Sequence, residues 1–161
     1  MPRWSSELYS LIEQRHLDFL INTNGERSPE VIAHELGVTT EILKRDFTKR
    51  QLNMIAFICI FSFPYNKKTA VIRNMQDFEL CGVSKTKVRD ELNKLCELNV
   101  ILWDKDSKEF SINDPKYWEV PFHNNYSDKR YQQMFIENLD HAGVDVSEMI
   151  ERLERLKRLK G

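Results

Sequence analysis

Residues 75–114, MQDFELCGVSKTKVRDELNKLCELNVILWDKDSKEFSIND, contain three successive patterns that decide the fold. The first is a short apolar segment that ends at Gly82. The second begins at Ser84 and carries apolar residues at helical spacing, namely Val88, Leu92, Leu95 and Cys96. From Val100 the pattern changes to two strand-like runs separated by the polar residues 104–109. A short helix, a tight turn, a longer helix and a β-hairpin in this order are typical of a winged helix-turn-helix.

The turn between the two predicted helices has a physical basis. Gly82 tolerates the left-handed backbone that ends a helix. Ser84 is a favourable N-cap, so we expect the second helix to span residues 84–98. Val88, Leu92 and Leu95 would then point inward, leaving an outward face on the half that enters the DNA major groove in this motif. The residues of that face are Ser84, Lys85, Thr86, Lys87, Arg89 and Asn93.

Composition and charge describe a water-soluble chain with a real core. The 161 residues are 41% hydrophobic and 30% charged, and the net charge of −1 does not by itself indicate a nucleic-acid partner. The distribution of charge is more informative. Residues 66–89 contain six Lys or Arg against two acidic residues, whereas residues 1–36 contain three against six. Such a division is what a one-sided nucleic-acid surface requires, and chance also produces it.

Other classes of protein have little support in the sequence. Cys59, Cys81 and Cys96 are odd in number and lack C-x-x-C spacing, which indicates buried reduced thiols. Neither a metal site nor a cofactor is predicted. The longest apolar run, residues 54–61, is too short to span a membrane, and no signal peptide is visible, so we expect a cytoplasmic protein. We find no phosphate-binding glycine loop or nucleophile–base pair, and we predict that the protein is not an enzyme.

The residues that precede the predicted winged helix-turn-helix have helical patterns. Residues 4–24 form one amphipathic pattern. In residues 28–47, SPEVIAHELGVTTEILKRDF, Gly37 is expected to stop one helix and Thr39 or Thr40 to cap another. This segment could be a second helix-turn-helix that contacts DNA through Thr40, Glu41, Lys44 and Arg45. A helical subdomain packed on the winged helix is favoured, because the surrounding segment is acidic.

The remaining elements complete the predicted architecture. Thr48 is expected to cap a core helix that runs from Lys49 to about Phe63, and residues 70–72 are expected to form a small strand. Aromatic residues between 117 and 122 are expected to pack on the domain, with base stacking as the alternative. Two helices follow, the first capped by Ser127 and ended by Gly143 and the second running from Ser147 to Lys160. We therefore predict a mainly α fold with a small β-hairpin, divided into residues 1–47, a winged helix-turn-helix at 48–122 and a C-terminal helical extension at 123–161.

Four stretches of the chain together resemble one known family. They are TEILKRDFTKRQLNMIAFI at 40–58, YNKKTAVI at 65–72, CGVSKTKVRDELNKLCELNVI at 81–101 and FSIN at 110–113. They are similar to the N-terminal origin-binding domain of phage lambda-type replication protein O and related phage replisome organisers. This chain departs from that pattern at Cys81-Gly82-Val83, where the family usually has Thr-Gly-Leu, and at Asn99, where it has Gly. The resemblance implies binding to repeated double-stranded DNA sequences at a replication origin.

The sequence therefore predicts a sequence-specific binder of double-stranded DNA, most simply a phage-type replication initiator. The 84–98 helix would read bases, and the 100–112 wing would contact the backbone through Lys105 and Lys108. Lys67, Lys68 and Arg73 would add backbone contacts. The alternatives are a transcriptional regulator and a protein-interaction module of a replication or transcription complex. Expected partners are DNA, a replicative helicase or helicase loader, and a second copy in a homodimer, but no membrane.

Overall fold

A computed structural model describes Leu11, residues 13–15, residues 17–18 and residues 27–160. The expected helix at residues 4–24 lies mostly outside the described residues, although those described within it are helical. The chain forms two compact units, one ending at Pro121 and one beginning at Phe122. Helices predominate beside one small antiparallel sheet, which confirms the predicted α+β class. No helix in the described part of the chain is both long and apolar enough to cross a membrane.

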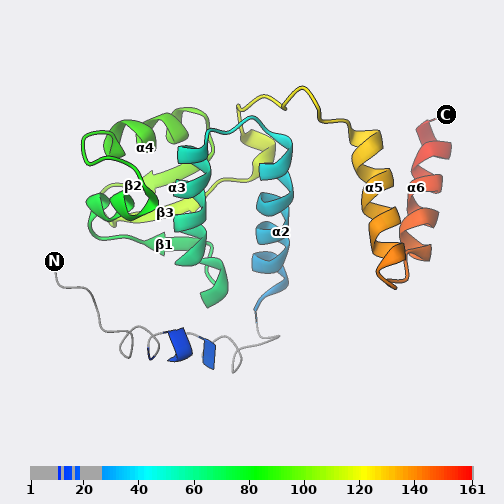
Figure 1. Cartoon of the computed structure of the whole chain (residues 1–161), viewed down its shortest axis with the longest axis horizontal. Helices are drawn as coiled ribbons and strands as arrows, with labels where there is room; N and C mark the ends of the chain where they lie inside the picture. Colours follow the sequence, from blue (N-terminus) through cyan, green and yellow to red (C-terminus); the bar gives the residue numbers. More distant parts are fainter. Residues whose placement is uncertain (1–10, 12, 16, 19–26, 161) are drawn as a thin grey trace. The chain divides into compact units, whose positions relative to one another are not determined.

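Helix α3 (Lys49–Ile60) is the central core element of the first unit (Figure 1). The predicted cap is confirmed: the Thr48 hydroxyl accepts from the Gln51 amide, and the Gln51 side chain accepts from the Thr48 amide. The helix ends three residues earlier than expected. The Ser62 hydroxyl donates to the Ile58 carbonyl, and a 3-10 turn, η1 (Phe63–Tyr65), follows. Pro64 therefore lies within that turn.

The three predicted strands form one sheet. Strands β1 (Thr69–Val71), β2 (Ile101–Asp104) and β3 (Glu109–Ile112) are ordered β1-β3-β2, and all neighbours are antiparallel. One face carries the buried side chains of Ala70, Ile101 and Phe110, which pack against α3 and its neighbours. The hairpin β2–β3 is the predicted wing, and β1 is the predicted small strand. Buried and exposed residues alternate in β1 and β3, as expected for strands with one face on the core.

The turn motif forms with one difference from the sequence prediction. Helix η2 (Met75–Cys81) is a 3-10 helix that ends at Gly82, whose φ of 88° is the expected left-handed conformation. Helix α4 (Val88–Glu97) begins four residues later than the predicted 84–98 helix. The Lys87 amide donates to the Ser84 carbonyl at 2.8 Å, so residues 84–87 close a separate turn. The prediction that Ser84 caps the helix is therefore wrong, and Lys87 occupies the cap position without a side-chain bond.

Helix α2 (Pro29–Lys44) runs without a break through Gly37. The predicted pair of helices at 28–47 is therefore wrong, and with it the second helix-turn-helix. Val31 and Val38 lie seven residues apart on one stripe and both enter the core, which outweighs the roughly 1 kcal/mol that glycine costs in a helix. The Thr39 and Thr40 hydroxyls donate back to carbonyls of the preceding turn instead of capping a new helix.

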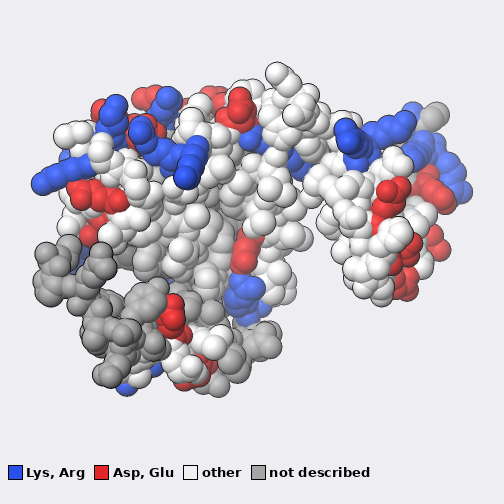
Figure 2. Space-filling model, viewed as in Figure 1, with Lys and Arg blue, Asp and Glu red and all other residues white. Residues whose placement is uncertain are grey.

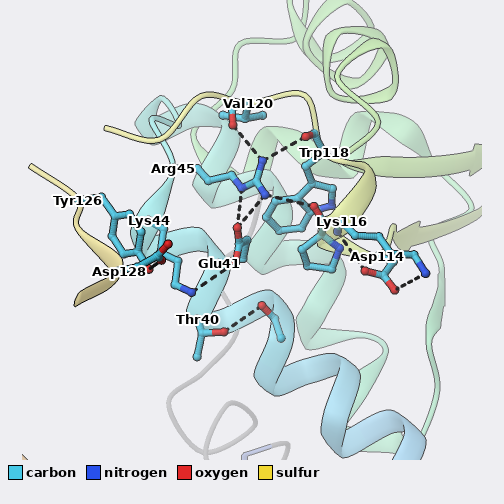
Figure 3. Close-up of polar contacts among 12 residues, drawn as sticks. Thr40, Glu41, Lys44, Arg45, Asp114, Lys116, Trp118, Val120, Tyr126 and Asp128 are labelled. Carbon is cyan, nitrogen blue, oxygen red and sulfur yellow. Dashed lines mark hydrogen bonds and ion pairs between the residues drawn. The ribbon is translucent and has the colours of Figure 1, made fainter. Parts of the chain in front are cut away.

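The end of α2 is fixed to residues 115–121 by Arg45, as Figure 3 shows. Its guanidinium donates to the carbonyls of Pro115, Trp118 and Val120 at 3.0 to 3.2 Å. It also pairs with Glu41 at 2.7 Å, and it lies over the Trp118 ring at 5.6 Å. A residue considered for DNA contact is thus part of the scaffold that holds α2 against the 3-10 turn η3 (Pro115–Tyr117) and the segment after it.

The second unit contains helices α5 (Asp128–His141) and α6 (Ser147–Lys160), which lie side by side as an antiparallel hairpin (Figure 1). The Ser127 hydroxyl caps α5 through the Arg130 amide, and Gly143 adopts a left-handed φ of 84° in the connecting loop, as predicted. Among the described residues of this unit, Val146 is the one hydrophobic residue that is buried.

Candidate nucleic-acid interface

The outward side of α4 and of the turn before it is open to solvent. Lys85, Thr86 and Lys87 are exposed on the turn, and Arg89 is exposed in the first turn of the helix. Asn93 lies one helical turn after Arg89 and is half-buried. The opposite side of α4 is fully buried, because Val88, Leu92 and Leu95 pack into the core. The structure therefore presents the predicted polar residues along one edge of the first unit, although only Arg89 and Asn93 belong to the helix itself.

Acidic side chains interrupt this surface, as the mixture of colours over α4 in Figure 2 shows. Asp90 is exposed, and Glu91 is half-buried. Arg50, near the start of α3, donates to the Glu91 carboxylate at 3.0 Å. Arg50 thereby offsets one of the two negative charges beside Arg89 and adds a cation to the same edge. The sequence did not reveal this role, because the two residues are 41 positions apart and meet only after α3 packs near α4.

The turn of the wing has a defined conformation. The pKa of Asp104 is held below its usual value because the Ser107 and Asp106 amides donate to its carboxylate, with the Ser107 hydroxyl adding a further bond. Lys108 adopts a left-handed φ of 63° at the end of the same turn. The Lys105 ammonium lies over the Trp103 ring, 4.9 Å from its centroid. Both predicted lysines of the wing are thus exposed on a turn whose geometry is set by Asp104.

The three cations around β1 separate into two places. Arg73 follows Ile72, whose amide donates to the Lys108 carbonyl at 3.0 Å, so Arg73 lies beside the wing turn. Lys67 and Lys68 precede β1 at the opposite end of the strand. There Asn66, in a left-handed conformation, accepts from the Ser28 amide, and Lys68 lies 3.7 Å from Glu30. The structure therefore groups Arg73 with the wing lysines and places Lys67 and Lys68 near the start of α2.

The aromatic segment that follows the wing divides between core and surface. Trp118 and Val120 are buried, and the Trp118 indole donates to the Asn113 carbonyl. Tyr117 and Phe122 are exposed. Packing on the domain, the favoured prediction, is confirmed for Trp118 and Val120. In the described residues no three His, Cys, Asp or Glu side chains are close enough together to hold a metal ion.

The order of elements and the sheet topology fit a winged helix-turn-helix, with α4 in the position of the recognition helix and β2–β3 as the wing. Comparison with known families identifies the group within this class. Residues 31–116, just over half of the chain, match the family model described as bacteriophage replication protein O. The chain belongs to this family, as the resemblance in its sequence predicted. No curated protein and no solved structure matches the chain.

Proposed function

We propose that this protein is a phage replication initiator that binds double-stranded DNA with sequence preference. In this proposal the turn at 84–87 and the first turns of α4 enter the major groove. Arg89 and Asn93 read base edges there, since Arg is suited to guanine and Asn to adenine. Lys105, Lys108 and Arg73 contact phosphates beside the groove. Membership of a phage replication family supports the biological role.

One observation carries the proposal: α4 buries one side completely and leaves the other open, and the wing turn exposes Lys105 and Lys108. A helix whose outward side packed against the rest of its unit could not enter a groove about 12 Å wide. Here the outward side bears Arg89 and Asn93 with Lys85, Thr86 and Lys87 directly before them, all exposed except Asn93. The Arg50 guanidinium pairs with the Glu91 carboxylate and so reduces the net negative charge beside Arg89.

Selection of bound duplexes from a random pool tests sequence preference directly. We expect enrichment of one short motif, and an affinity for that motif that falls steeply as salt rises, because phosphate contacts release counterions. Tandem copies of the motif within one phage genome support an origin, whereas a single palindrome at a promoter supports a transcriptional regulator. A pool that shows no enrichment, together with affinity that is independent of salt, refutes the DNA-binding proposal.

A protein partner is part of the same proposal. An initiator must bring a replicative helicase or its loader to the DNA, and a surface away from α4 and the wing would make that contact. Pull-down from host lysate with nuclease present tests this point. Recovery of a helicase or loader by both the unaltered chain and Arg89→Ala supports separate DNA and protein surfaces. Loss of that recovery in Arg89→Ala contradicts this separation.

A further inference from the structure

The hairpin α5–α6 leaves much of its apolar surface uncovered. Two helices of 14 residues each form a compact unit, yet in the described part of it only one apolar residue is buried, Val146, at 6% exposure. Leu156 is 53% exposed, and Phe135 and Ile150 are each 40% exposed. Isolated helices of this length are marginal in water and depend on packing of an apolar face. The hairpin therefore requires a further surface to cover it.

A groove between the two helices shows where such a surface fits. It has a volume of about 570 Å³, and Ile136, Ile150 and Leu153 supply its apolar side chains. Charged side chains stand around them: Glu137 belongs to the half of α5 nearer the connecting loop, and Lys157 to the half of α6 farther from it. An apolar centre with a charged border is the usual composition of a protein–protein interface.

The charges of the hairpin are sorted along its length. The half that contains the connecting loop, residues 135–153, has five carboxylates and one basic side chain: Glu137, Asp140, Asp145, Glu148 and Glu151, with Arg152. The other half, residues 128–134 with 154–160, has six basic side chains: Lys129, Arg130, Arg155, Lys157, Arg158 and Lys160. That half has two acidic side chains, Asp128 and Glu154. The net charges of the two halves are therefore equal and opposite, −4 and +4.

We propose that this hairpin binds the hairpin of a second copy of the chain, head to tail, through the α5–α6 groove. A twofold axis through the middle of the groove places the acidic half of each copy against the basic half of the other. Glu137 of each copy then faces Lys157 of its partner copy, and the Ile136, Ile150 and Leu153 side chains of both copies meet at the centre. The product is a four-helix bundle, the common arrangement for amphipathic helices of this length. A parallel pairing would instead bring like charges together.

Some of these charges also pair within α6. Arg152 lies 2.7 Å from Glu148, and Arg155 lies 3.7 Å from Glu151. These pairs sit at the boundary of the two halves, and the basic residues beyond them, from Lys157 to Lys160, have no acidic neighbour three or four residues away except Glu154. The proposed partner supplies acidic groups to that end of the hairpin. Neither the groove nor its charges belong to the DNA surface, so this proposal does not depend on DNA binding.

Sedimentation velocity of the full chain, with nuclease present, tests the proposal at micromolar concentrations. We expect a species of twice the 19.2 kDa of one chain at low salt. Glu137→Lys and Lys157→Glu should each raise the dimer dissociation constant by about tenfold or more, because each reversal turns two attractive pairs into two repulsive ones. The double variant with both changes should restore the dimer. Glu119→Lys, an equal change of charge on an exposed residue of the first unit, should leave it unchanged.

The outcomes separate the possible occupants of the groove. A chain that remains monomeric at all concentrations shows that its own first unit or an unrelated partner covers the hairpin, and this overturns the proposal. A dimer that survives both single reversals, or one that the double variant fails to restore, overturns the head-to-tail pairing. Circular dichroism of each variant confirms that α5 and α6 are retained, and the restored double variant excludes misfolding as the cause of the losses.

Discussion

Replacing Arg45 with alanine should destabilise the first unit strongly. The guanidinium serves three carbonyls and one carboxylate, and the side chain is only 11% exposed. Hydrogen bonds to a charged group contribute about 1.5–3 kcal/mol each, but they are not additive. Removing one member of a buried ion pair costs about 3–5 kcal/mol, because the remaining charge loses its partner. Solvent can reach part of this cluster, so we expect a loss of about 3–4 kcal/mol.

Urea unfolding followed by tryptophan fluorescence measures this effect in the correct unit. Trp4, Trp103 and Trp118 all precede Phe122, so the signal does not report on the α5–α6 hairpin. Lys116→Ala is the matched control, because it removes an exposed cation 3.9 Å from Asp114 beside the same cluster. We expect that control to change stability by less than about 0.5 kcal/mol. If the two variants shift the unfolding midpoint equally, Arg45 is not a structural clamp.

Three further predictions concern single residues. Gly82→Ala should lower the free energy of unfolding by roughly 1–2 kcal/mol because the φ of Gly82, 88°, is left-handed, whereas Gly37→Ala, inside α2, should raise it by about 0.5–1 kcal/mol. Shifts of the urea unfolding midpoint in the same direction for both variants would contradict this prediction. Burial, and to a smaller extent the nearby Glu35 charge, raises the pKa of Cys59 from 9.0 to about 12. Alkylation of Cys59 should therefore be far slower in the native protein than after unfolding, and equal rates would show that the thiol is accessible. For the same reason, the stability that depends on the neutral Cys59 thiol is fully present below pH 9 and is lost as pH rises from 9 towards 12. The variant Cys59→Ala should therefore lose less stability over that pH range than the unaltered chain, and an identical pH dependence would show that ionisation of Cys59 does not affect stability.

The sequence predicted those elements whose signals are local. The strands were predicted from short apolar runs at 70–72 and 100–103 and from Phe110 and Ile112, and the cap of α3 from Thr48, a residue type favoured at that position. The turn at Gly82 followed from the backbone freedom of glycine. Asn99, where the resembling family has glycine, adopts a left-handed φ of 60° after α4, which gives a physical reason for that family pattern.

Predictions failed where tertiary contacts outweighed local preference. Gly37 and the two threonines after it indicate a helix end, but Val31 and Val38 reach one core only if α2 continues. The role of Arg45 was not predictable, because its carbonyl partners lie 70 to 75 residues away. In the candidate site, Arg89 of α4 and Lys105 and Lys108 of the wing are exposed, whereas Asn93 is half-buried. The separation of Lys67 and Lys68 from the wing, and the position of Arg50, depend on packing that the sequence does not encode locally.

The central claim is that α4 reads bases while the wing contacts the sugar-phosphate backbone. The most direct measurement compares Arg89→Ala with Lys105→Ala in binding to the selected duplex and to a scrambled duplex of equal length. We predict that Arg89→Ala loses on the order of 1–3 kcal/mol on the selected duplex only, while Lys105→Ala weakens both duplexes about equally and lowers the salt slope. Equal losses on both duplexes from both variants, or no loss from either, would contradict the account.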